Sequence, residues 1–221
     1  MRPSRPHQFL AILTAGLFLA PSTLAFSFPL SEESVREAYF LGQRRDESMA
    51  LFLARYKQTL RPPGTGPYIS SVELLTPFAQ LVHLSSQRSN YSAQQAEKEH
   101  RRDDETVAIT IEIQLTNFYG AIIAQPTSSR SGSPMGYKLR YSNFWEDFDV
   151  QVLVDDKGLE PTLFTGEPNY RCVYDGGCIL TGATLRLELP AKLFDSDSAT
   201  VHVIPPEGPE VFADFDLTKL R

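Results

Sequence analysis

The sequence is poor in the residues and patterns that build common metal, redox and nucleotide sites. It has two cysteines and four histidines among 221 residues, and two cysteines are too few for a zinc ribbon or an iron–sulfur cluster. No H-E-x-x-H, G-x-S-x-G or G-x-x-x-x-G-K-[ST] pattern occurs, so the zinc-protease, serine-hydrolase and P-loop signatures are missing. We therefore predict no catalytic residues, no metal and no cofactor.

The chain also lacks an excess of positive charge. Its formal net charge is −6 and its pI is about 5.3, whereas a nucleic-acid binder needs a basic face against phosphates. The apolar fraction of 42% is too high for a disordered chain and too low for a protein with many membrane spans. We expect a globular protein that does not bind nucleic acid.

Long apolar runs are absent apart from one near the N-terminus. Phe9 to Ala20 spans about a dozen residues, short of the roughly 20 that a membrane helix needs. Arg2 and Arg5 precede the run, and small residues follow it up to Ala25. This pattern predicts a signal peptide over residues 1–25, with a retained anchor as the weaker alternative. We expect a secreted or periplasmic protein without a membrane anchor after cleavage.

Export bears on the two cysteines, Cys172 and Cys178. An oxidising compartment favours a disulfide between them, and the Asp-Gly-Gly turn that separates them is typical of a hairpin. The chain-entropy model gives such a bridge about 2.4 kcal/mol. A redox pair normally has C-x-x-C spacing, which is not present, and unpaired thiols are the other alternative.

Residues 26–103 are predicted to form a helical region with one short strand at Tyr68–Leu75. Signals for helix N-caps occur at Ser34, Asp46, Thr76 and Ser92. Pro77 follows Thr76 at the first helical position, where its missing N–H costs nothing.

Residues 104–221 are predicted to form a β-sandwich domain. Apolar and mostly polar residues alternate from Val107 to Leu115, which is typical of a strand with one buried face. The further candidate strands are 137–141, 147–154, 162–165, 169–174, 178–180, 184–189, 200–204 and 211–217. Residues 125–136 are predicted to be a loop. Short strands without intervening helices favour an antiparallel Ig-like sandwich, so the predicted fold class is α+β.

Four stretches together resemble a group of secreted bacterial proteins of unknown function. They are Gly66–Ile69, Tyr91–Ala96, Phe144–Phe148 and Phe215–Arg221. The resemblance implies export and extends over most of the region after residue 25. It implies no activity and assigns no functional residue.

The sequence favours a non-enzymatic binding or scaffolding protein of the bacterial envelope or extracellular space, with an unknown protein or glycan partner. Phe144 and Trp145 are candidate ligand contacts because exposed aromatic rings stack on sugars or anchor a partner, although Trp145, together with Phe148, also suits the core. One alternative is a glycan-acting hydrolase that uses carboxylates near 146–156. Another is a carbohydrate-binding module that uses Trp145.

Overall fold

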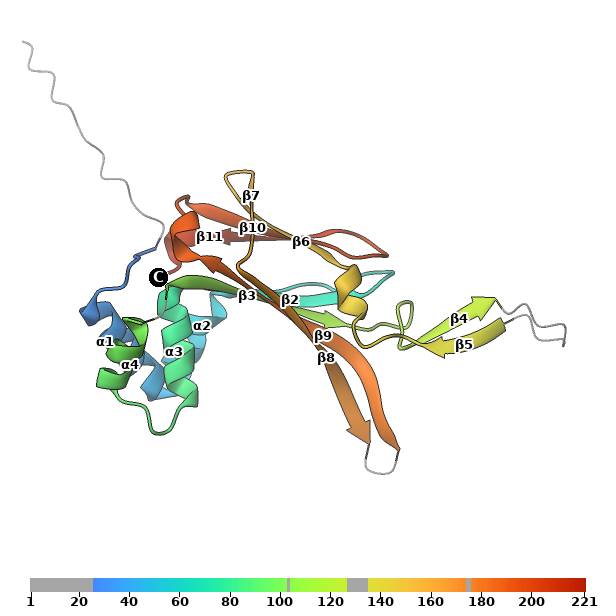
Figure 1. Ribbon diagram of the computed structural model, residues 1–221, viewed down its shortest axis with the longest axis horizontal. Helices are drawn as coiled ribbons and strands as arrows, with labels where there is room; N and C mark the ends of the chain where they lie inside the picture. The colour runs from blue at the N-terminus through green and yellow to red at the C-terminus, as the bar shows by residue number, and fades with distance from the viewer. Residues whose placement is uncertain (1–25, 103, 127–134, 174–175) are drawn as a thin grey trace, which may run out of the picture.

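The computed structural model describes residues 26–102, 104–126, 135–173 and 176–221. The predicted signal peptide at 1–25 lies outside these residues. N-terminal helices are followed by antiparallel sheets of five, four and two strands, which confirms the α+β class (Figure 1). No helix of the described part of the chain is long and apolar enough to cross a membrane.

Residues 26–102 contain four α-helices. They are α1 (Glu32–Arg44), α2 (Glu47–Ala54), α3 (Pro77–Gln87) and α4 (Ala93–His100). Short 3-10 helices follow at η1 (Phe144–Asp147), η2 (Ala191–Leu193) and η3 (Leu217–Lys219).

The five-stranded sheet has the order β1-β2-β3-β9-β8. Its strands are β1 (Lys57–Thr59), β2 (Tyr68–Leu75), β3 (Thr106–Gln114), β8 (Leu163–Val173) and β9 (Gly177–Pro190). The four-stranded sheet has the order β11-β10-β6-β7, with β6 (Asp149–Val154), β7 (Lys157–Leu159), β10 (Ser198–Ile204) and β11 (Val211–Asp216). The third sheet is a hairpin of β4 (Ile122–Pro126) and β5 (Met135–Leu139). Because β2 pairs with β3, chain on both sides of residue 103 builds the first sheet.

Three of the predicted N-caps are confirmed. The Asp46 carboxylate accepts hydrogen bonds from two backbone N–H groups of α2, and the Thr76 hydroxyl accepts one from α3. Ser92 and Gln95 form the reciprocal capping box of α4. The cap predicted at Ser34 is wrong, because Ser31 caps α1 and its hydroxyl accepts from the Ser34 N–H.

The central strand β3 follows the predicted alternation. The side chains of Val107, Ile109, Ile111 and Ile113 are fully buried, and β2 and β9 pair with the strand on either side. One hydrophobic cluster contains Ile109 and Ile111 of β3 together with Val152, Val201 and Phe215 of the four-stranded sheet. The two sheets therefore share a core.

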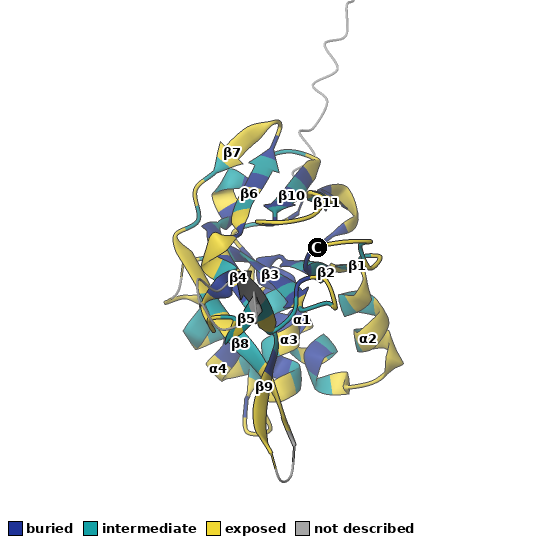
Figure 2. Ribbon diagram, turned by 90° about the vertical axis from the view of Figure 1, so that its right-hand side faces the viewer, coloured by how far each residue is buried: buried dark blue, intermediate teal, exposed yellow. Residues whose placement is uncertain are grey.

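The helices have their own smaller core, which is formed by Leu30, Val35, Ala38, Phe78, Leu81, Val82, Tyr91 and Ala96. In Figures 1 and 2, the helices lie on the side of the five-stranded sheet away from the four-stranded one. They also gather toward one end, which leaves the opposite end of the sheets to the two long hairpins.

Two strands are longer than predicted. The single strand β8 contains residues 163–165 and 169–173 of two predicted segments, while residue 174 lies outside the described residues. The predicted segments 178–180 and 184–189 both lie in β9. The ladder between β8 and β9 continues past a register shift at Asn169 and Tyr170. The predicted loop 125–136 is wrong at its ends, because β4 and β5 pair there, and its middle, 127–134, lies outside the described residues.

Candidate functional site

The predicted disulfide is confirmed. Cys172 and Cys178 are bridged, and they stand directly opposite each other near the outer end of the β8–β9 hairpin. The bridge ties the two strands together beyond the point where the rest of the sheet supports them. It is consistent with folding in an oxidising compartment.

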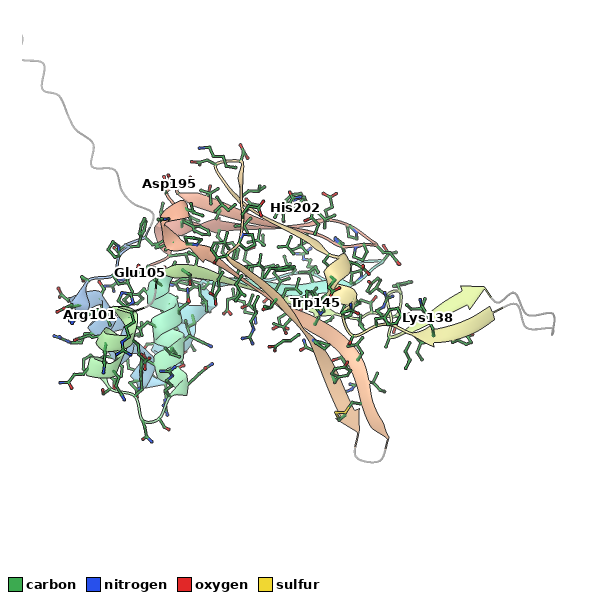
Figure 3. All side chains as sticks on the ribbon, in the orientation of Figure 1. Arg101, Glu105, Lys138, Trp145, Asp195 and His202 are labelled. Carbon is green, nitrogen blue, oxygen red and sulfur yellow. A yellow bond between two sulfur atoms is a disulfide. The ribbon has the colours of Figure 1, made fainter. Side chains whose placement is uncertain are left out.

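The two candidate ligand contacts in η1 occupy different environments. Phe144 is only 3% exposed, and its ring lies 6.2 Å from Tyr119 and 6.1 Å from Phe148. Trp145 is half-buried against β8, where a Cβ added at Gly166 would lie 2.3 Å from the indole. Figure 3 shows Trp145 beside the sheets, not on the projecting hairpins. A ligand role for either residue stays a prediction.

The carboxylates near 146–156 are spread over the length of β6. Glu146 and Asp147 belong to η1, Asp149 begins β6, and Asp155 and Asp156 follow its end. At about 3.3 Å per residue, Asp149 and Asp155 are roughly 20 Å apart, beyond the 5–9.5 Å that separates a glycosidase pair. Of these groups, Glu146 accepts a hydrogen bond from Asn143, and Asp155 accepts one from Ser196.

The histidines are not brought together. His83, His100 and His202 lie on α3, α4 and β10, respectively, and each bonds to a different neighbour. These neighbours are Gln87, Glu105 and Glu210. Within the described ranges, no group of three or more His, Cys, Asp or Glu residues could hold a metal ion.

A groove of about 1090 Å³ opens where the β4–β5 and β8–β9 hairpins leave the body of the protein. Its floor is the end of β3 and the adjoining part of β9, up to Gly182. One wall is formed by the base of the β4–β5 hairpin, and the other by Tyr170 and Ile179 of the β8–β9 hairpin. We call residues 117–123, 136–142, 169–172 and 176–182 the groove segments. Figure 1 shows the two hairpins diverging from this end of the sheets.

Large exposed apolar side chains concentrate on the groove segments. Seven of the twelve in the described part of the chain lie there, namely Phe118, Ile122, Tyr137, Leu139, Tyr141, Tyr170 and Ile179. The most exposed are Tyr137 at 76%, Leu139 at 74% and Phe118 at 72%. Figure 2, which faces this end, shows the β8–β9 hairpin exposed beyond the body. Exposed apolar clusters of this kind mark interaction sites.

The charged groups of the groove segments are all cationic. They are Lys138, Arg140 and Arg171. The Arg140 guanidinium lies 3.4 Å from the centroid of the Tyr119 ring, and its Nε donates to the Gly120 carbonyl at 2.9 Å. Burial raises the pKa of the Tyr119 phenol, and the nearby Arg140 charge partly offsets that rise. This cation–π contact holds Arg140 at the base of the hairpin.

Sequence reasoning missed the groove although it predicted a strand at 137–141. Tyr137, Leu139 and Tyr141 alternate with Lys138 and Arg140, which indicates a strand with one apolar face. The pattern does not say whether another element covers that face. In the structure Tyr137, Leu139 and Tyr141 are exposed, so the predicted strand alone did not reveal the site.

Comparison with known proteins found no family model that matches the chain and no matching curated protein.

Proposed function

We propose that this protein is an exported, non-enzymatic binding protein whose recognition surface is the groove between the two hairpins. The observation that carries the proposal is the concentration of exposed aromatic and aliphatic side chains on the groove segments. Leaving such side chains in water costs free energy that a partner recovers by covering them. The core does not need them, because they lie outside its clusters.

The scaffold proposed for this surface is an Ig-like sandwich. An Ig domain has the strand order A-B-E-D in one sheet and G-F-C, extended by C′, in the other. With β1 and the β4–β5 hairpin left out, the remaining strands lettered along the chain give the orders β2-β3-β9-β8 and β11-β10-β6-β7, which match this scheme. The β4–β5 hairpin then occupies the B–C connection, which in variable domains contributes to binding. The matching strand orders support the Ig-like fold. The comparison of the β4–β5 hairpin with a binding loop of variable domains is an analogy between folds.

Export is the second part of the proposal. The predicted signal peptide and the Cys172–Cys178 bridge support it, because disulfides persist in oxidising compartments. We also propose that the protein belongs to the group of secreted bacterial proteins that its sequence resembles, since export is what that group shares.

Site-specific photo-crosslinking in the producing cells tests the binding function. Benzoylphenylalanine at Tyr170 samples the groove, and the same probe at Phe212 on β11 is a matched control, since the two rings are 51% and 54% exposed. We expect a discrete adduct from position 170 but not from 212, and its loss when Ile179→Glu is added. Equal adducts from both positions, or none from position 170, would overturn the proposal.

A further inference from the structure

Building on the binding function proposed above, we propose that the groove binds an extended acidic segment of a polypeptide partner, which adds as a strand to the open edge of β9. Three features support this occupant. They are an open strand edge, cations that have no carboxylate partner among the described residues, and apolar side chains on the groove walls.

The open edge begins where β3 leaves the sheet. The ladder between β3 and β9 ends at the pair Gln114 and Gly182, and one further hydrogen bond of 2.8 Å runs from the Leu115 N–H to the Thr181 carbonyl. Beyond it, residues 177–180 of β9 pair with β8 on one side, and the described part of the chain supplies no strand on the other. These four residues offer about 13 Å of edge for strand addition.

Two cations line the groove beside this edge, Arg140 and Arg171, and Lys138 adjoins Arg140 on the β4–β5 hairpin, so the charge of this region favours an acidic occupant. Lys138, Arg140 and Arg171 form no salt bridge with any carboxylate among the residues that the structure describes. The groove segments contain no Asp or Glu, although the whole chain has a net charge of −6. One carboxylate, that of Glu112, lies on the groove floor, where it accepts a hydrogen bond from Thr184. A partner segment with carboxylates would complement the three cations.

The apolar side chains distinguish a peptide from a membrane surface. Ile122, Leu139, Tyr170 and Ile179 line the groove. On the β8–β9 hairpin, Tyr170 and Ile179 stand between the disulfide and the core, so they are set back from the hairpin end. A bilayer would meet the hairpin ends first, whereas a strand inside the groove would reach these side chains. Alternate residues of such a strand would face the walls, as in other cases of strand addition.

A random dodecapeptide display library, selected on the full-length disulfide-bonded protein, tests the proposal. A parallel selection uses the double variant Lys138→Glu/Arg171→Glu. We expect peptides rich in Asp and Glu that alternate with apolar residues, enriched only on the wild type. By fluorescence anisotropy, the double variant should weaken the best peptide at least tenfold. Methylation of alternate backbone nitrogens of that peptide should abolish binding, because it removes the N–H donors of the added strand.

The control variant is Lys157→Glu/Lys192→Glu, which reverses two exposed cations outside the groove segments, one in β7 and one in η2, which follows the opposite end of β9. It should leave the Kd within twofold, and thermal melts should show that both double variants fold. Peptides without acidic residues, or equal binding to the wild type and the groove variant, would overturn the proposal. So would cosedimentation with phosphatidylglycerol vesicles in place of peptide binding, or self-association that buries Tyr170. If the Tyr170 crosslink persists in any of these cases, the groove still binds a partner of another kind.

Discussion

Gly182→Ala tests how β9 is held in the sheet. Gly182 pairs with Gln114 at the end of the β3–β9 ladder that is nearest the groove. A Cβ at this position would lie 2.0 Å from the Ile113 carbonyl oxygen and 3.2 Å from the Gln114 Cα. Both atoms belong to the backbone of the central strand, so no side-chain rotation relieves the clash. The strands must separate, at the place where the groove floor meets the core.

Overpacking of a core costs about 1–3 kcal/mol and sometimes more. In a domain of this size, each kcal/mol shifts the Tm by about 2–4 °C, so we expect Gly182→Ala to lower the Tm by about 2–12 °C. Differential scanning calorimetry of the oxidised protein measures the shift. Gly158→Ala is the matched control, because its Cβ would meet nothing within 4 Å, and its Tm should stay near that of the wild type. If the two variants melt together, the close approach of β3 and β9 is refuted.

Three further outcomes are expected. Cys172→Ser should lower the free energy of unfolding by about 2.4 kcal/mol in urea titrations, since it opens a loop of about seven residues; no loss would contradict the bridge. The Arg221 guanidinium lowers the pKa of Glu37 from 4.5, so their ion pair stabilises the fold above that pH and is lost as the pH falls through the folded-state pKa. Between about pH 6 and 3, the free energy of unfolding of Glu37→Gln should therefore fall less than that of the wild type. If the two free energies fall in parallel with pH, the stabilising role of the ion pair is refuted. Ile111→Asp should cost about 3 kcal/mol or more by chemical denaturation, because it buries an unpaired charge; an unchanged midpoint would mean that the strand register is wrong.

Helix caps and strand alternation could be predicted from the sequence because they depend on residues close together in the chain. The caps at Asp46, Thr76 and Ser92 could be predicted because a side chain that bonds amides two or three residues ahead leaves a short sequence pattern. Ser31 was missed because Ser34 and Glu37 fit the same pattern three residues later. The alternation in β3 was reliable because this strand packs one face against a continuous core.

The elements that form the groove depend on contacts that local patterns do not record. Gly166 and Gly182 fall in the gaps between predicted strands, but in the structure each lies within a strand and makes room for a close neighbour. That neighbour is the Trp145 indole at Gly166 and the β3 backbone at Gly182. Strand β4 was missed because its pairing with β5 crosses a long connection. The groove forms because two hairpins leave the sheets in different directions, and the sequence of neither hairpin alone predicts their relative direction.

The division between a shared interior and two projecting hairpins has an evolutionary consequence. In the groove segments Tyr119, Leu180 and Gly182 are buried, Ala121 packs against the core, and Cys172 and Cys178 form the bridge. Substitutions at the exposed positions without such contacts leave the interior packing intact. Descendants of this chain can therefore acquire new specificities by changing those positions while keeping the same architecture. Rapid divergence along the two hairpins, beside slow change in β3, is the pattern to expect when homologous sequences are aligned.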